Sequence, residues 1–581
     1  MRLLTAAALL QAVQASIDFS TNANLSSWDQ DNWTLTTHHY VPGQYQSRIS
    51  LANGYVGASL AAAGPFFEVD VNQTDAKGTQ PTNGWPLFDT RLSFSTISGF
   101  YNSQKNTTGT NFPWLTQYGW DSFIAGIPHP TSIIFEFGDS CLDATVANTT
   151  ISNFKSSISF KTGVAEWSYT WKPSKSPVAA SFEVFYSVIF SRKRHNVIAT
   201  KATITPSKDV NGTVSDLLDG RSALRANLAT RGKHVSRKNN KLDATLYAAV
   251  HPDGLPKVSG WVVSEADFAP ASGNGREAKG ACISSNSSSI AHSFDLHLKA
   301  NKTATFYKYV GVASTDKFEN AEKTARTAAS DAKAQGWDAL VKEHKEAWAL
   351  IMTPDAVDDF TSPSSGDLPE DSNIEALQIG SVSSTYYILQ NLMPDDGTGL
   401  NENSISVGGL SSDSYSGQVF WDADYWVAPS LNLAFPDYAK QIANLRVKQH
   451  GEAYKNAQFN GWPNKTALFP WTTGRTGNCT ATGPCVDYQY HLNHDIAFNI
   501  LQLQNVTQND TWFENGPEKV VMAAAEMSAH LLQYDNKTQQ YVIKNATDPD
   551  EYANHVDNTA FTLASASQLL QRANELLAAK G

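Results

Sequence analysis

A change of hydrophobic period near residue 315 constrains the fold of this chain more than any other feature. From about residue 37 to 312, apolar and polar residues alternate in runs that are broken by Gly, Pro, Asn and Ser. The runs Ser181 to Phe190 and Val197 to Thr205 predict one hairpin, and Ala304 to Val310 alternates in the same way. Many short alternating runs of this kind indicate a large antiparallel β-sandwich.

After residue 315 the pattern is helical. The Ala-, Lys- and Glu-rich segment Asp316 to Met352 predicts one or two linking helices interrupted near Gly336, and a Pro/Ser/Asp-rich piece follows up to residue 371. A later helix is expected to begin at an N-cap, Asn373, and to reach Leu392. Further helices are expected over Asp437–Lys455, Asp495–Leu503, Pro517–Tyr534 and Asn558–Ala579. We therefore predict an α+β multidomain protein with a β-sandwich at 37–315, a helical linker at 316–371 and a helical domain at 372–581.

Composition narrows the class of protein. The chain has 581 residues with 41% hydrophobic content, which is enough for more than one packed core. Its formal net charge is -12 and only 17% of its residues are charged. A nucleic-acid partner is not expected, because a phosphate backbone is bound through clustered Lys and Arg.

The N-terminus predicts export. Met1 and Arg2 precede an apolar run and a small-residue site ending near Ala15, which is typical of a secretory signal peptide over residues 1–15. That run is too short to span a membrane, which takes about 20 apolar residues, and no later stretch supplies them. Asn-x-Ser/Thr sequons recur along the chain, for example at Asn24, Asn148 and Asn301. We expect a secreted glycoprotein, either extracellular, in the cell wall or vacuolar.

Four cysteines suit the same oxidising compartment. Cys479 and Cys485 are close enough in sequence to close one short loop, which leaves Cys141 and Cys282 as a candidate long-range pair. A zinc site would require closer pairs with histidines nearby. Disulfide bonds are therefore expected rather than a metal site.

The segment Pro549-Asp550-Glu551-Tyr552 lies between two predicted helices. Asp548, Asp550 and Glu551 would repel one another when ionised, so an enclosed loop would favour the protonated form of at least one. A glycosidase needs such a group to protonate the departing glycosidic oxygen. The alternative is a solvated surface loop or a set of helix-capping carboxylates.

Two other segments carry candidate site residues. In Val419 to Trp426, which reads VFWDADYW, Trp421 could stack on a sugar face while Asp422 accepts bonds from paired hydroxyls. The alternative is a core aromatic segment with a capping aspartate. A second segment runs from Phe469-Pro470-Trp471 to His491 and Asp495, whose i, i+4 spacing fits metal ligation, substrate positioning or helix capping. Nucleophile-elbow, phosphate-loop and metalloprotease motifs are absent from the sequence.

Together these segments resemble glycoside hydrolase family 65, and most closely its fungal acid trehalase branch. The matching motifs begin with NGYVG at 53–57 and PLFD at 86–89 and continue through GGL, VFWDADYW and FPWTTGR to PDEY and VDN. The resemblance implies an N-terminal antiparallel β super-sandwich, a helical linker and a partial (α/α)6 barrel. It also implies hydrolysis of α,α-trehalose to two glucose molecules with inversion, without a cofactor or a metal ion.

Carried over residue by residue, the resemblance makes Glu551 the general acid and assigns Trp421 and Asp422 to the sugar whose bond is cut. Trp471, His491 and Asp495 would shape the pocket less directly. An inverting glycosidase also needs a base whose carboxyl lies roughly 6.5 to 9.5 Å from the acid, which leaves room for water. In the family that base and a Lys-Gln pair come from the second half of the barrel, and nothing after Asn558 resembles them. We expect the full gene product to be longer and this chain alone to be inactive.

Two alternatives remain open. A family-65 disaccharide phosphorylase would depend on phosphate, and a non-catalytic carbohydrate-binding protein would bind trehalose without cleaving it. The choice among trehalose, kojibiose and nigerose depends on loops that the sequence does not place, and oligomeric state leaves no clear mark.

Overall fold

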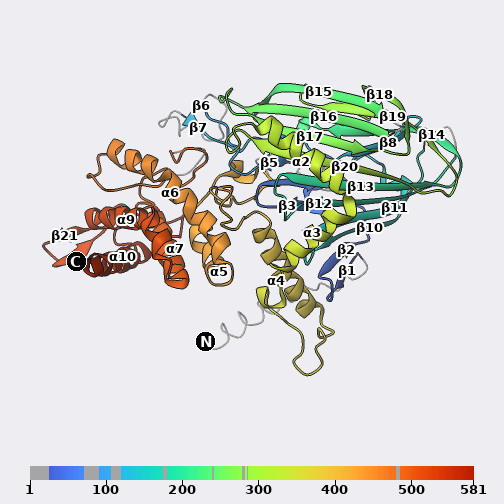
Figure 1. The fold of residues 1–581 in the computed structure, drawn as a ribbon. Helices are drawn as coiled ribbons and strands as arrows, with labels where there is room; N and C mark the ends of the chain where they lie inside the picture. The colour runs from blue at the N-terminus through green and yellow to red at the C-terminus, as the bar shows by residue number, and fades with distance from the viewer. Residues whose placement is uncertain are drawn as a thin grey trace, which may run out of the picture.

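The structure is a computed structural model that describes residues 25–70, 91–105, 120–174, 179–238, 241–277, 282–283, 286–478, 480 and 484–580. The predicted signal peptide at 1–15 and the predicted disulfide partner Cys479 lie outside the described residues. Figure 1 shows a β-rich N-terminal half that is followed by a helical C-terminal region. The change of period near residue 315 is therefore confirmed as a change of architecture.

The largest sheet of the N-terminal half is antiparallel throughout. Its strands, in spatial order, are β1 (Ser26–Asp29), β2 (Thr34–Thr37), β10 (Ile151–Ser159), β11 (Val164–Trp171), β12 (Phe182–Phe190), β13 (Val197–Pro206), β20 (Ala304–Ser314), β17 (Gly260–Asp267), β16 (Lys241–Pro252) and β15 (Ala226–Lys238). The predicted hairpin is strands β12 and β13, which pair directly.

A second antiparallel sheet packs against the first. Its order is β18 (Ala271–Glu277), β19 (Ile290–Leu298), β14 (Val210–Leu218), β8 (Ile133–Phe137) and β9 (Ser140–Leu142). Aromatic rings join the two layers, since Phe137 stacks on Phe182 with ring centroids 4.3 Å apart and Phe135 meets Phe306 at 5.2 Å. The large antiparallel sheet structure expected for this half is therefore present.

Smaller strands connect this half to the helical region. They are β3 (Ile49–Ala52), β4 (Val56–Leu60) and β5 (Ser95–Ile97), which form one sheet, and the pair β6 (Gln104–Lys105) and β7 (Trp120–Asp121). The Oγ of Ser50 in β3 lies 2.6 Å from the Oγ of Ser411. A Cβ at Gly57 would lie 2.6 Å from the Cβ of Leu410, so only glycine allows β4 to approach this loop so closely.

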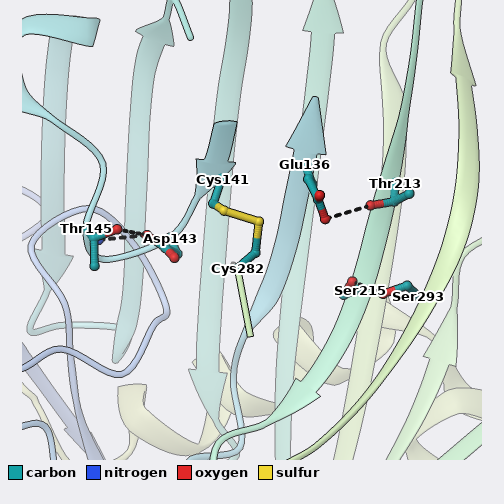
Figure 2. The surroundings of a disulfide bond; sticks show 8 residues. All are labelled: Glu136, Cys141, Asp143, Thr145, Thr213, Ser215, Cys282 and Ser293. Atoms are coloured by element: carbon teal, nitrogen blue, oxygen red, sulfur yellow. Dashed lines mark hydrogen bonds between the residues drawn. A yellow bond between two sulfur atoms is a disulfide. The ribbon is translucent and has the colours of Figure 1, made fainter. Parts of the chain in front are cut away.

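A disulfide joins Cys141 on β9 to Cys282, with Cα atoms 5.4 Å apart (Figure 2). Figure 2 also shows the adjacent strands, where Thr213 of β14 donates a 3.5 Å hydrogen bond to Glu136 of β8. The candidate long-range pair is therefore confirmed. Cys485 is also disulfide-bonded.

The linker contains two helices, α2 (Ala321–Gln335) and α3 (Trp337–Ala349), as the sequence predicts. Gly336 separates them with φ +81°, a conformation that favours glycine. Alanines Ala321, Ala325 and Ala329 of α2 pack against Val263 of β17 and Ala313 of β20. The small side chains let the helix lie directly on the sheet.

The C-terminal region is helical from α4 (Ser372–Leu389) onward. It continues through the π-helix η8 (Ala423–Val427), α5 (Ala428–Ala434), α6 (Pro436–Phe459), α7 (His491–Thr507), α8 (Asp510–Glu514), α9 (Pro517–Leu531) and α10 (Ala560–Lys580). Helices α7, α9 and α10 bury an apolar cluster that includes Ile496, Val520 and Leu569. Among the described helices, none is long and apolar enough to cross a membrane.

Several predicted helix boundaries are wrong, among them those of α7, which runs from His491 to Thr507 and not from Asp495 to Leu503. The N-cap of α4 is Asp371, whose side chain accepts a hydrogen bond from the Asn373 N–H at 2.8 Å, so Asn373 lies inside the helix. Helix α9 stops at Leu531, because the next residues form the hairpin of β21 (Gln533–Asp535) and β22 (Gln540–Val542).

Candidate active site

The segment that carries Trp421 and Asp422 leads into a π-helical turn. The Ala428 N–H donates to the carbonyl of Ala423, five residues earlier. Pro429 has no N–H for the carbonyl of Tyr425, so the regular helical bond is missing at this point. The wider turn leaves Asp422 exposed and directs Asp424 into the protein interior, where it is 1% exposed.

The Trp471 segment is fixed to the Trp421 segment by backbone hydrogen bonds. Val419 and Thr473 exchange N–H to carbonyl bonds of 2.9 and 3.0 Å. The Phe469 N–H donates to the side-chain oxygen of Asn493 in α7 at 3.0 Å. The first contact joins the two loops, and the second holds them against the N-terminal turn of α7.

Trp421, Trp471 and Phe561 each bring an aromatic ring against His491, and Trp426 contacts Trp421. The Trp421 ring centroid lies 4.9 Å from that of His491, 6.2 Å from Trp471 and 5.7 Å from Trp426. Phe561 of α10 meets His491 at 5.7 Å. Trp421 is only 5% exposed, so most of its indole is packed inside this cluster.

His491 and Asp495 form a buried pair on α7. Nδ1 of His491 lies 2.8 Å from Oδ2 of Asp495, and both side chains are inaccessible to solvent. Burial raises the pKa of Asp495 to about 6, although the hydrogen bond from His491 opposes the shift. Helix capping by Asp495, one of the alternatives from the sequence, is wrong because α7 begins at His491.

A buried ion pair that was not predicted from the sequence lies close to Asp495 and influences its pKa. Arg446 of α6 donates to Asp424 through Nη2 at 2.5 Å and Nε at 3.1 Å, and both side chains are at most 1% exposed. Burial raises the pKa of Asp424, against the effect of Arg446. The only sign of this ion pair in the sequence is Asp424, the second acid of the FWDAD motif, and nothing in the sequence indicates that it is buried.

The loop that carries Glu551 is anchored at both ends. Ala546 and Val556 exchange two backbone hydrogen bonds of 2.9 Å, and the Thr547 N–H donates to the Tyr488 carbonyl at 2.9 Å. Tyr488 lies just before α7, so the loop is tied to the helix that presents His491. The anchors place Glu551 close enough to Asp422 and His491 for their charges to influence its pKa.

The three acids of this loop have different environments. Asp548 accepts hydrogen bonds from the backbone N–H groups of Phe561 at 2.8 Å and Thr562 at 2.9 Å, which cap α10. Although burial alone would raise the pKa of Asp548, hydrogen bonds from Thr562 and its neighbours lower it. Asp550 accepts a 3.1 Å bond from the Tyr552 N–H. The helix-capping alternative is therefore confirmed for Asp548.

Glu551 is the acid of this loop whose pKa is raised. Its side chain is exposed, yet desolvation by the protein on one side raises its pKa, and the charge of Asp422 raises it further. His491 acts in the opposite direction. Burial also raises the pKa of Asp422. The arrangement favours a proton on the Glu551 carboxyl.

A groove of about 590 Å3 adjoins this cluster, and both Asp422 and Trp426 line it. Trp426 is 59% exposed and was not selected from the sequence, although it stands in the same motif. Arg48 and Ser50, from the N-terminal half, also line the groove, together with Gly409. The groove therefore lies between the two halves of the chain.

The structure brings together Trp421, Asp422, Trp471, His491, Asp495 and Glu551, the residues predicted from the sequence. Within the described ranges, no group of three His, Cys, Asp or Glu side chains is placed to hold a metal ion. The predicted Cys479–Cys485 bond involves a residue outside those ranges.

Comparison with known proteins identifies the family. Residues 35–351 match the N-terminal domain of glycosyl hydrolase family 65, and residues 385–580 match the central catalytic domain of that family. The acid trehalase of Emericella nidulans is 40% identical over 94% of this chain and 52% of its own length. The cell wall acid trehalase of Arthroderma benhamiae is 38% identical over the same shares.

A solved structure supports the fold. The putative kojibiose phosphorylase from human microbiome superposes with a TM-score of 0.73 at 16% identity, over 96% of this chain and 66% of that one. The chain spans about half the length of the curated acid trehalases that it matches. Because the family's N-terminal domain alone matches more than half of its residues, the chain belongs to glycosyl hydrolase family 65.

Proposed function

We propose that this protein is part of a secreted acid trehalase that hydrolyses α,α-trehalose to two glucose molecules with inversion. The observation that carries the proposal is the raised pKa of Glu551, which desolvation and the neighbouring Asp422 produce. A general acid needs a proton at its working pH, and a second carboxylate nearby helps to retain it. The names of two similar relatives, the acid trehalases of Emericella nidulans and Arthroderma benhamiae, supply the substrate and the reaction.

Each predicted residue has a role in this proposal. Glu551 protonates the bridging oxygen, the exposed carboxylate of Asp422 accepts hydrogen bonds from sugar hydroxyls, and Trp421 forms the wall behind that sugar. Trp471 supports the indole of Trp421 from the side at 6.2 Å. His491 and Asp495 lie behind the wall and influence the charge of the site. The proposal needs no cofactor.

The general base belongs, in this proposal, to polypeptide outside this chain. Helices α4 to α10 are then the first half of an (α/α)6 barrel that follows a β super-sandwich at 37–315 and a linker at 316–371. An apolar groove of about 890 Å3 along α9 and α10, lined by Leu532, Leu563 and Leu570, offers a surface for further helices. The two acid trehalases are about twice as long as this chain, which also supports a general base outside it.

Secretion is a further part of the proposal. The predicted signal peptide and the sequons support it, and the Cys141–Cys282 disulfide fits an oxidising compartment. The relative from Arthroderma benhamiae is named a cell wall protein.

The test is glucose release from trehalose at acidic pH, by the chain alone and by the chain co-expressed with the C-terminal half of the Emericella nidulans enzyme. We expect release only by the co-expressed pair, and a loss of roughly 10²- to 10⁴-fold in Glu551→Gln. Asp550→Asn is the matched control, since the amide still accepts the bond from the Tyr552 N–H; it should retain turnover.

Four outcomes would change the proposal. Wild-type turnover in Glu551→Gln would remove the acid assignment, and robust turnover by the chain alone would remove the external base. Inversion yields equal amounts of α- and β-glucose before mutarotation, which NMR detects directly. Cleavage that depends on phosphate would indicate a phosphorylase, and preferential cleavage of kojibiose would change the substrate.

A further inference from the structure

The pair formed by His491 and Asp495 contains two polar atoms without a hydrogen-bond partner. His491 Nε2 and Asp495 Oδ1 are both buried and both unpartnered within the described part of the chain. Nδ1 of the same imidazole is engaged by Asp495 Oδ2 at 2.8 Å, so Nε2 points away from the carboxylate. An unpartnered polar atom in a dry site is costly unless its surroundings complement it.

The number of protons held by His491 and Asp495 depends on the charges buried beside them. Arg446 and Asp424, which form the ion pair beside it, cancel each other. Asp495 ionised beside a neutral His491 would then leave one uncompensated negative charge in the interior, which is strongly unfavourable. One shared proton makes the buried group of four neutral. Among the described residues, His491 also influences the pKa of Glu551 and of its helix neighbour His494, and the charge of Asp422 acts on the same Glu551.

The shared proton also fixes the chemistry of Nε2. If the proton is on His491, both ring nitrogens carry hydrogen; if it is on Asp495, the acid donates to Nδ1 and the neutral ring carries its hydrogen on Nε2. In both forms Nε2 is a donor. When the shared proton leaves to solvent, Nδ1–H donates to the carboxylate and Nε2 becomes an acceptor.

The imidazole lies among aromatic rings, and within the described residues no hydrogen-bond partner reaches its Nε2. Its plane is nearly perpendicular to three aromatic rings, at 84° to Trp421, 82° to Trp471 and 88° to Phe561. Aromatic faces are electron-rich, so they attract an N–H edge or a cation and repel a lone pair. The shortest of these contacts, 4.9 Å between centroids, is with Trp421.

We propose that the His491–Asp495 pair is a positioning device for the indole of Trp421, and that its shared proton keeps Nε2 a donor toward the aromatic rings so that sugar binding weakens when the proton is lost. This inference rests on the proposed role of Trp421 as the wall of the sugar site. It adds a pH dependence of binding that is separate from proton donation by Glu551.

The first test needs no catalysis. Near-ultraviolet circular dichroism of the ligand-free chain, which reports on packed tryptophans, is followed from pH 4 to 8. We expect a transition near pH 6, where the pKa of Asp495 lies. Asp495→Asn is nearly isosteric and should move the transition to lower pH, because a neutral amide favours the extra proton less. His491→Gln should abolish it.

The second test is binding of glucose, which avoids turnover, followed by tryptophan fluorescence. Affinity should be about fivefold weaker at pH 7.5 than at pH 4.5, a ratio typical of losing one weak hydrogen bond of this kind. The pH effect should disappear in His491→Gln. His297→Gln is the control, because His297 is exposed on β19 in the β-rich half and should leave both titrations unchanged.

A dichroism transition that is absent, or that persists unchanged in both Asp495→Asn and His491→Gln, would overturn the proposal. So would glucose affinity that does not vary with pH in the wild-type chain. Failure of the glycosidase assay with the dichroism transition intact would instead reject the proposed function and leave the proton-dependent packing of Trp421 standing.

Discussion

The charge of Asp422 raises the pKa of Glu551, although the two residues belong to different segments on opposite sides of helix α7 in the sequence. Backbone hydrogen bonds make this possible, since the Glu551 loop is tied to Tyr488 and the Asp422 segment is tied to Thr473. His491, at the start of the helix between them, lowers the same pKa. The proton affinity of Glu551 is thus raised most by desolvation, raised further by the charge of Asp422 and lowered by His491.

The buried ion pair of Asp424 and Arg446 supports the turn that presents Asp422. Replacing Arg446 by methionine should lower the free energy of unfolding by roughly 3–5 kcal/mol, because Asp424 is left buried without a partner. The pKa of Asp424 is already raised by burial, so the unpaired acid takes up a proton in acid and the loss should be smaller at pH 4.5 than at pH 7.5.

Urea unfolding of Arg446→Met at the two pH values measures this effect. The double variant with Asp424→Asn is the control, because it removes the stranded charge and should recover part of the lost stability. An Arg446→Met protein as stable as the wild type at pH 7.5 would show that the pair is dispensable.

His494 should destabilise the protein in acid. It is buried between Ser565 at 2.7 Å and Ser528 at 2.9 Å, and burial lowers its pKa to about 3. As the pH falls, His494 binds a proton in the unfolded chain, where its pKa is about 6.5, before it does so in the native protein. The stability that depends on neutral His494 is therefore complete above about pH 6.5 and declines by about 1.4 kcal/mol per pH unit between pH 6.5 and 3.

In His494→Gln this decline should be absent. The difference in unfolding free energy between variant and wild type should shift in favour of the variant by roughly 2 kcal/mol from pH 6.5 to pH 4.5, as measured by urea unfolding. The same comparison with the exposed His530→Gln should show little change with pH. A constant difference for His494→Gln would mean that the ring is already charged in the native protein.

Much of the fold follows from patterns that the sequence displays. The alternation in Ser181–Phe190 and Val197–Thr205 specifies strands because each has one face toward the core, and β12 and β13 agree with it closely. The boundary errors have local causes. Asp371 and Asn373 are both good N-caps, so composition alone does not choose between them.

The site could be predicted only where a motif carries its chemistry. The sequence indicated Glu551 and the Trp421 segment, but it could not show that Asp548 caps a helix or that Asp424 is buried. Those assignments depend on the π-helical turn and on pairing with distant residues such as Arg446. Contacts of this type are set by tertiary structure, and local periodicity does not reveal them.

The Cys141–Cys282 disulfide should stabilise the β-rich half. The double variant Cys141→Ser/Cys282→Ser should lose roughly 2–4 kcal/mol of unfolding free energy, because the bond restricts a long segment of the unfolded chain. Thermal unfolding measures the loss, and peptide mapping without reductant should recover the two cysteines in one linked peptide. Recovery of both as free thiols would contradict the structure.

The most direct test of the account is the titration of the Glu551 carboxyl itself, by NMR of protein labelled with 13C at the glutamate carboxyl and assigned with Glu551→Gln. We expect Glu551 to titrate above the ordinary value of a glutamate, and Asp422→Asn to lower its pKa. A Glu551 carboxyl that titrates at or below the ordinary value, and does not respond to Asp422→Asn, would contradict its assignment as the proton donor.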